Sequence, residues 1–468
     1  MFAYGVMPPA MFATLVAVFL FGFPVAFSLT ALGLFFGALG IAFGHFEATF
    51  LQALPLRIFG IVSNELLLAI PFFTFMGAIL ERCGLAEDLL DGMGQLFGRV
   101  PGGLAVAVIL VGAVLGAVTG TVAASVIAMA VISLPIMTRY GYDMKLATGV
   151  IAASGTITQL IPPSLVLIIL ADQLGTPVSD MYLGATGPSF LQVLIFLLYI
   201  GALALLKPHL MPPLPPEARI DRGWPLAIKL IRGMLPSLAL IFLVLGTIAL
   251  GLASPTEAGA MGAVGALVIA ALYRRLTWRF VSEAMSSTMR LTSMVIFILI
   301  GATVFTLVFR GMDGGFWIEH LLVGLPGGQV GFLIFVNIAV FLLAFFLDFF
   351  EIAFIVIPLL APVAEKLGID LVWFGVLLCI NMQTSFMHPP FGFALFYLRG
   401  VAPPSVKSTD IFIGALPWVL LQLLLVAVVI AWPGSVTYWT ADRTTIDPST
   451  VPIILQAPAF EAPAGPRF

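Results

Sequence analysis

The chain has 468 residues, of which 61% are apolar and only 9% charged, and its mean hydropathy is +1.15. This composition excludes an ordinary soluble domain and predicts an all-α polytopic membrane protein. The net charge of −3 gives no basic surface, so nothing indicates a nucleic-acid partner. Cys83 and Cys379 lie far apart in or beside apolar segments, so we expect no disulfide framework.

Apolar segments follow one another along the whole chain. A bilayer core about 30 Å thick needs roughly 20 apolar residues per helix. The segment that begins near residue 10 lacks a basic leader and a cleavage site, so we expect mature protein and not a signal peptide. In chain order we predict spans near 10–26, 27–44, 64–81, 147–171, 187–206, 235–252, 256–273, 290–309, 370–398 and 409–432.

Two longer apolar stretches, 101–138 and 328–365, are interrupted at polar centres. The first centre is Val118–Thr121 and the second is Asp348–Glu351. Each stretch could cross the membrane twice, but a polar centre suits burial at mid-depth within protein. We therefore expect two re-entrant helical hairpins.

Proline pairs interrupt two of the predicted spans. The sequences are SGTITQLIPPS at 154–164 and NMQTSFMHPPF at 381–391. Proline removes a backbone donor and clashes with the preceding turn, so 147–171 and 370–398 should each be a broken helix. A matched pair of broken helices in the two halves of a membrane protein indicates a transport site.

The two breaks belong to an internal repeat. Gly141-Tyr142-Asp143 and Gly368-Ile369-Asp370 precede them at the same distance, with an offset of 227 residues. Most of the 20 basic residues fall on one predicted side, which the positive-inside rule makes cytoplasmic. Each half holds five spans and one hairpin, so the second half enters inverted relative to the first. The basic residues predicted to be external are Arg57, Arg310, Lys366, Arg443 and Arg467.

This reading divides the chain into four parts. Residues 1–206 form the first inverted repeat and 235–432 the second. Between them, 207–234 is a Pro-rich cytoplasmic linker with an interfacial helix, and 433–468 is a C-terminal tail. Residues 274–289 predict a second interfacial helix.

The polar residues of the tips and breaks supply the carbonyl and hydroxyl oxygens that a sodium ion needs. The alternative is that small residues only allow close helix packing, but their occurrence as a pair favours an ion site. The residues concerned are Thr119, Gly120, Thr121, Ser125, Ser154, Gly155, Thr156 and Thr158 in the first half, and Asn381, Gln383, Thr384 and Ser385 in the second.

Four ionisable residues deserve separate interpretation. Asp348 and Glu351 lie in long apolar runs, where they could coordinate a cation, select a substrate or cap a helix, and for Asp348 capping is slightly favoured. Glu257 follows Ser254-Pro255 and suits the first turn of a helix. His388 could ligate, titrate or, by default, bond a freed carbonyl. No transition-metal spacing, phosphate loop or nucleophile elbow appears, so no enzyme activity is indicated.

With these features the chain resembles the large membrane subunit of TRAP transporters (tripartite ATP-independent periplasmic transporters, DctM-like), nearest the branch associated with mannitol or chloroaromatic substrates. The resemblance spans both halves. Its motifs are TGTVAASVIAMAVISLP (119–135), LATGVIAASGTITQLIPPSLVLIILADQLG (146–175), SPTEAGAMGA (254–263), LDFFEIAFIVIPLLAPVAEKLGIDLVWFGV (347–376) and NMQTSFMHPPFGFALFYLRGVAP (381–403).

The resemblance implies an elevator-type secondary transporter of the ion transporter superfamily kind, in the bacterial inner membrane. It would import a small organic anion with a cation gradient, sodium being the expected coupling ion and protons the alternative. Its partners would be a small four-helix DctQ-like membrane subunit and a periplasmic solute-binding protein. The implied cation sites are Thr119–Thr121 with Thr158, Ile161 and Pro163, and Asp348 with Ser385, His388 and Phe391; candidate substrate contacts are Ser125, Ser154, Thr156, Asn381, Gln383 and Thr384.

The chain departs from the family pattern at Thr158, where relatives typically have glycine, and at His388, where they typically have threonine. Ala123 also stands where the branch often has glycine. These changes leave the number of sodium ions open and make proton coupling at the second site a hypothesis. The alternatives to a binding-protein-dependent transporter are a stand-alone divalent-anion symporter and a channel-like membrane protein.

Overall fold

The structure is a computed structural model that describes residues 5–119, 121–219, 223–389 and 392–440. Over these ranges the regular secondary structure is helical. Seven of the helices are long and apolar enough to cross a membrane, or up to nine if each of two bent pairs counts as one span. The predicted all-α polytopic class is therefore confirmed.

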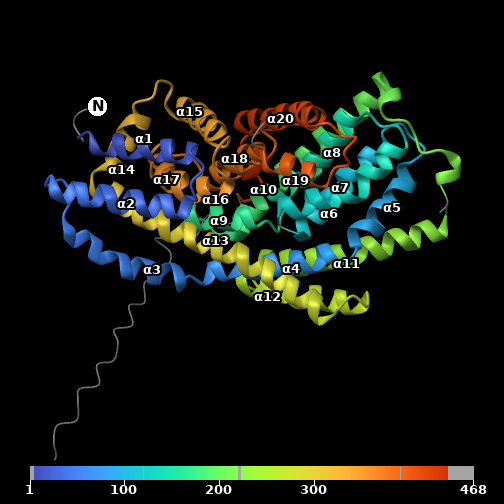
Figure 1. Ribbon diagram of the computed structural model, residues 1–468, viewed down its shortest axis with the longest axis horizontal. Coiled ribbons are helices and arrows are strands. Elements are labelled where there is room, and N and C mark those ends of the chain that lie inside the picture. The colour runs from blue at the N-terminus through green and yellow to red at the C-terminus, as the bar shows by residue number, and fades with distance from the viewer. Residues whose placement is uncertain (1–4, 120, 220–222, 390–391, 441–468) are drawn as a thin grey trace, which may run out of the picture.

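One group of helices forms a layer that we call the scaffold layer, and most of it runs along the lower side of Figure 1. Small residues let these helices approach closely. For example, a Cβ atom added to Gly301 of α13 would lie 2.5 Å from the Ala26 carbonyl oxygen of α2. The layer comprises α2 (Val25–Ala42), α3 (Leu54–Val62), α4 (Ala69–Arg82), α11 (Trp224–Ala249), α12 (Pro255–Leu272) and α13 (Trp278–Gly311).

The hairpins and broken helices form a second group, the inner unit, on the other side of Figure 1. Helices α10 (Val178–Leu206) and α20 (Ser408–Ala431) flank it, while α1 (Met7–Leu20), α5 (Leu85–Phe97) and α14 (Gly314–Val323) lie at its edges and α21 (Gly434–Thr437) follows α20. The inner unit comprises α6 (Gly103–Thr119), α7 (Val122–Arg139), α8 (Met144–Thr156), α9 (Leu165–Leu174), α15 (Gly328–Leu343), α16 (Phe349–Glu351), α17 (Ile357–Lys366), α18 (Leu371–Gln383) and α19 (Phe393–Val401), with a π-helical segment, Ile352–Val356, between α16 and α17.

The internal repeat is visible in local structure. Helices α8 and α18 have 13 residues each, and each is followed by a three-residue 3₁₀ turn, Ile157–Gln159 and Thr384–Phe386. Both helices begin at the aspartate of the repeated Gly-x-Asp sequence, where Asp143 accepts a hydrogen bond from the Leu146 amide and Asp370 from the Trp373 amide. The duplicated sequence therefore builds the same cap, helix and break twice.

Several features differ from the sequence predictions. The expected interfacial helices are not separate elements, because α11 and α13 each run unbroken from the polar segment into the span. No helix-breaking residue separates the two parts of α13, and the Thr277 hydroxyl caps its start by accepting from the Phe280 amide. Helices α3, α5 and α14 lie outside the predicted spans, since they are short or charged. The span expected at 64–81 is the second part of a pair bent by 46°.

Candidate functional site

Hydroxyl groups line both breaks, and each of them donates to its own helix. The side chains of Ser154, Thr156 and Thr158 donate to the carbonyls of Ile151, Ala153 and Gly155. In the second half Thr384 and Ser385 do the same to Asn381 and Met382. Such bonds keep each hydroxyl close to the backbone of its own helix. A hydroxyl that donates in this way can still offer its oxygen lone pairs to a cation, although the Thr156 oxygen already accepts from Gln422.

The first hairpin packs on the first break through a glycine seam. A Cβ atom on Gly112 of α6 would lie 2.6 Å from the Ser154 Cβ, and one on Gly116 would lie 2.8 Å from the Thr158 Cγ2. From the other limb, the Val126 side chain lies 2.2 Å from the position of a Cβ on Gly155. The structure thus brings Thr158, Ser154 and Gly155 against both limbs of the hairpin, and it shows that these small residues also serve packing.

The second break is held to the first limb of the second hairpin. The Asn381 side-chain amide donates to the Asn337 carbonyl (2.7 Å) and to its side-chain oxygen (3.0 Å). His388 is 1% exposed, and its ring lies 4.3 Å from that of Phe341 and 4.2 Å from that of Phe345. Neither ring nitrogen has a hydrogen-bond partner among the described residues. Within the part of the chain that the structure describes, His388 therefore does not make the bond to a freed carbonyl that was the default expectation.

Asp348 and Glu351 form a reciprocal cap at the tip of the second hairpin. The Asp348 Oδ1 accepts from the Glu351 amide (3.1 Å), and the Glu351 Oε2 accepts from the Asp348 amide (3.0 Å). The capping interpretation of Asp348 is thus confirmed in geometry, and one carboxylate oxygen of Asp348 takes no part in it. Glu257 makes the same kind of cap with Ser254, as its position predicted.

Asp348→Asn and Asp348→Ala separate the cap from a charge effect. Asparagine keeps a capping oxygen, so we expect near-native thermal stability for Asp348→Asn and a loss of about 1 kcal/mol for Asp348→Ala. Thermal unfolding measures the cap, and the sodium concentration that half-saturates uptake measures the charge. If Asp348 is an ion ligand, Asp348→Asn raises that concentration although it leaves stability intact; an unchanged value assigns the carboxylate to the cap alone.

A buried network of amides joins the two repeats. The Gln192 side chain of α10 donates to the Gln383 oxygen of α18 (2.6 Å), and the Gln422 side chain of α20 donates to the Thr156 hydroxyl of α8 (3.1 Å). Gln422 also reaches the Gln383 oxygen at 3.5 Å. Thr156 and Gln383 are the last residues of the equivalent helices α8 and α18, so the two bonds are related by the internal repeat.

Gln192 and Gln422 were not among the predicted site residues. A signal was present, because each is a lone polar residue inside a long apolar span. Gln159 and Asn337 were missed as well. The Gln159 side-chain oxygen and the Asn381 side-chain oxygen are buried without hydrogen-bond donors among the described residues. Unpaired oxygens of this kind fit the oxygen coordination of a hard cation.

Some of the remaining predicted site residues lie outside the described part of the chain, and others are described and buried. Gly120, Phe391 and the side chain of Thr119 lie outside the described residues, so the tip of the first hairpin is described only at Thr121, the residue before α7. Ser125 is buried in α7 and Pro163 is buried after the 3₁₀ turn. Of the site predicted from sequence, the structure therefore brings 154–158 and 381–388 together across the joint between the repeats.

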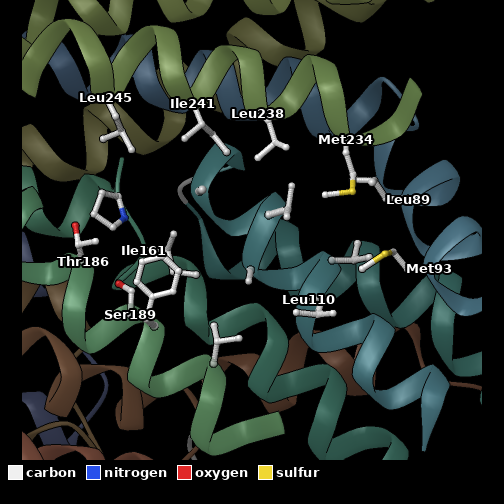
Figure 2. Close-up of a pocket in the computed structure, with 17 residues that line it drawn as sticks. Leu89, Met93, Leu110, Ile161, Thr186, Ser189, Met234, Leu238, Ile241 and Leu245 are labelled. Atoms are coloured by element: carbon white, nitrogen blue, oxygen red, sulfur yellow. The ribbon is translucent and has the colours of Figure 1, made fainter. Parts of the chain in front are cut away.

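A cavity of about 570 Å³ separates the inner unit from α11 (Figure 2). Figure 2 shows the side chains of Met234, Leu238, Ile241 and Leu245 pointing into it from α11. Its wall is apolar apart from Thr186 and Ser189, and the Ser189 hydroxyl is already bonded to the Leu160 carbonyl. Ile161 lines this cavity too. An apolar wall offers nothing to an organic anion, so this cavity is not its site.

The amino-acid sequence is similar to those of known transport proteins over most of its length. Residues 12–435 match the family described as "Tripartite ATP-independent periplasmic transporter, DctM component". The C4-dicarboxylate TRAP transporter large permease protein DctM of Pseudomonas aeruginosa is 31% identical over 391 residues, which cover 83% of this chain and 89% of that protein. The 2,3-diketo-L-gulonate TRAP transporter large permease protein YiaN of Escherichia coli is 28% identical over 373 residues, covering 78% and 84%.

Two further proteins are more distant. The isethionate TRAP transporter permease protein DctMQ of Oleidesulfovibrio alaskensis is 25% identical over 419 residues, covering 89% of this chain and 64% of that protein. Among solved structures, the YdaH transporter of Alcanivorax borkumensis superposes with a TM-score of 0.60 at 16% identity, covering 90% of this chain and 98% of that one. At this identity the likeness concerns the fold alone.

Proposed function

We propose that this chain, which belongs to the family of DctM components of tripartite ATP-independent periplasmic transporters, is the subunit that translocates a small organic anion, driven by a sodium gradient. The chain is a multi-pass membrane protein and not an enzyme by family. The observation that carries the proposal is the repeated 13-residue helix and 3₁₀ break, which presents hydroxyl and unpaired amide oxygens in both halves.

The anionic nature of the cargo is inferred from relatives whose names specify C4-dicarboxylates, 2,3-diketo-L-gulonate and isethionate. We propose a DctQ-like small membrane subunit and a periplasmic solute-binding protein as partners, supported by the family description and by the relative named DctMQ. We also propose, from the sequence motifs alone, that the chain is nearest the mannitol or chloroaromatic branch. The bacterial inner membrane follows from the periplasmic partner.

The chain's own residues suggest how an ion would couple to movement. Oxygens of Thr158 and Gln159 would hold sodium in the first half, and those of Asn381 and Ser385 in the second. A bound cation would offset the cost of the unpaired buried oxygens and so tighten each hairpin against its broken helix. The inner unit would then move as one body past the scaffold layer and carry the anion with it.

Thermal unfolding of the detergent-solubilised complex in sodium chloride and in choline chloride tests the ion. Sodium at one hundred times its dissociation constant should stabilise the folded state by about 2.7 kcal/mol. Thr158→Val keeps the side-chain shape and removes the hydroxyl oxygen, so it should reduce the sodium-specific rise. The control is Thr247→Val on α11, whose hydroxyl bonds to the Leu243 carbonyl. Equal rises in both variants would remove Thr158 from the ion site.

A proton-coupled transporter is the second candidate, favoured by the two unpaired ring nitrogens of His388. Uptake by His388→Thr at several pH values distinguishes the ions. If the wild type and the variant share one pH profile and one sodium dependence, proton coupling at His388 is excluded. Uptake that proceeds without any solute-binding protein would instead favour a stand-alone symporter.

A further inference from the structure

A polar cavity of about 390 Å³ lies between the scaffold layer and the inner unit, away from the two breaks. The scaffold contributes Arg57 from α3, Asn64 from the bend before α4, and Thr303 and Arg310 from α13. The inner unit contributes the end of α9 and residues 354 and 358. All these segments fall at the membrane side that the charge distribution predicts to be external.

Two arginines of the cavity are available to an incoming anion. Neither Arg57 nor Arg310 forms an ion pair among the described residues; Arg310 donates to the Pro358 carbonyl (3.1 Å), and both side chains are exposed. Arginine presents a planar fork of donors that matches a carboxylate in a bidentate way. A pair of arginines in one hollow, free of carboxylate partners, is therefore an anion-binding arrangement.

The acidic groups nearby are already engaged. Asp172 lines the same cavity, and its two oxygens accept from the side-chain amides of Asn64 (2.9 Å) and Gln173 (2.8 Å). Glu319 lines the adjoining cavity beside Arg310 and is paired with Lys366. With one aspartate and two arginines, the ionisable lining carries a net positive charge.

The polar lining suits a small hydroxylated or carboxylated molecule. Thr303, Thr306 and Arg310 lie at helical spacing on one face of α13, with about 10 Å between the first and the last along the axis. The Thr303 hydroxyl makes no hydrogen bond among the described residues, whereas that of Thr306 bonds to the Ala302 carbonyl. A volume near 390 Å³ is at the lower end of small-molecule sites.

We propose that this cavity is the external receiving site of the transporter, in which Arg57 and Arg310 bind the carboxylate or sulfonate group of the substrate before it reaches the breaks. The inference rests on the proposed function and adds the residues that select for negative charge. The site spans the two parts that would move past each other, since the Asn64–Asp172 and Arg310–Pro358 hydrogen bonds both cross from the scaffold layer to the inner unit.

Charged thiol reagents test the cavity without requiring transport. Thr303→Cys places one thiol in the cavity, and the reaction rates of the anionic sulfonatoethyl and the cationic trimethylammonioethyl methanethiosulfonates are compared from outside right-side-out vesicles. Cys83 and Cys379 are buried, and burial raises the pKa of the Cys83 thiol to about 11, so the parent chain provides a low blank. Rates are normalised to those with a free thiol in solution.

We expect the anionic reagent to be preferred about tenfold, and the preference to shrink with added salt. Adding Arg57→Gln and Arg310→Gln to Thr303→Cys should remove it. The matched control is Arg290→Gln, which removes an exposed arginine of the same helix roughly 30 Å from Arg310. An anion preference that survives loss of both cavity arginines overturns the proposal, as does labelling that occurs only from the cytoplasmic side.

Protection by organic anions tests the substrate class. Succinate and isethionate at millimolar concentration should slow modification of Thr303→Cys several-fold, and choline should not. Anion preference without protection by either anion would show a merely electropositive surface and reject the receiving site. If the anions protect the Thr303→Cys thiol but the chain shows no sodium-driven uptake, the proposed sodium coupling is rejected and the receiving site is still supported.

Discussion

Gln383→Leu is expected to abolish uptake and to lower the free energy of unfolding by about 2 kcal/mol. The substitution removes the oxygen that accepts from Gln192 and Gln422 inside the joint between the repeats. Gln192 is buried, so its amide keeps its desolvation cost when it loses this acceptor, typically about 1–3 kcal/mol, whereas Gln422 still donates to the Thr156 hydroxyl. Thermal unfolding and uptake into proteoliposomes measure the two effects.

A double-mutant cycle distinguishes a stabilising network from a functional one. Replacing both partners by apolar residues removes the unpaired amide, so Gln192→Leu with Gln383→Leu should recover part of the lost stability. Uptake should stay low, because the amides that link the two breaks are gone. Gln52→Leu, at an exposed glutamine, is the control. Full additivity of the two single losses would contradict the proposed contact.

Gly149→Val is expected to prevent correct folding of the inner unit, and Gly414→Val should do the same. A Cβ on Gly149 of α8 would lie 2.2 Å from the Gly414 carbonyl oxygen of α20, and one on Gly414 would lie 2.1 Å from the Lys145 carbonyl oxygen. A backbone carbonyl cannot move aside as a flexible side chain can, so the two helices must separate. We expect this to cost more free energy than the roughly 1–3 kcal/mol that is usual for overpacking. Folded yield after size-exclusion chromatography measures the outcome.

Matched glycines provide the control for this prediction. Gly201 of α10 and Gly246 of α11 also lie in long membrane helices, but a Cβ at either position meets nothing within 4 Å. Gly201→Val and Gly246→Val should therefore give near-native yield. If all four valine variants gave equal yields, the close crossing of α8 and α20 would be wrong.

Local features of the site followed from the sequence because they depend on neighbours in the chain. The Pro-Pro pairs predicted the two breaks, since proline acts on the turn that precedes it. The Gly-x-Asp sequences, at the same distance before both breaks, predicted the internal repeat, and the spacing of Asp348 and Glu351 allowed a cap. Hydropathy predicted the fold class for the same reason, as each span is a continuous run.

The start of a long helix could not be predicted from its charged residues, because the helix continues through them. Arg279 and Glu283 suggested a separate interfacial helix, yet they belong to the first turns of α13, where Glu283 pairs with Arg82 of α4 (2.7 Å). The helix simply extends out of the bilayer because no residue ends it. Helix α5 was not predicted because the charged residues on one face lower the hydropathy of a segment whose other face is buried.

Only the tertiary structure decided which polar groups meet. Gln192 and Gln383 lie in different repeats, and so do Thr156 and Gln422; only folding places them within hydrogen-bond distance. Arg57 and Arg310 looked like ordinary external charges until α3 and α13 were seen to line one cavity. The sequence by itself determined most of the spans, the two breaks and the caps at Asp348 and Glu257, which are local; partnership across the repeats depends on packing that no short segment encodes.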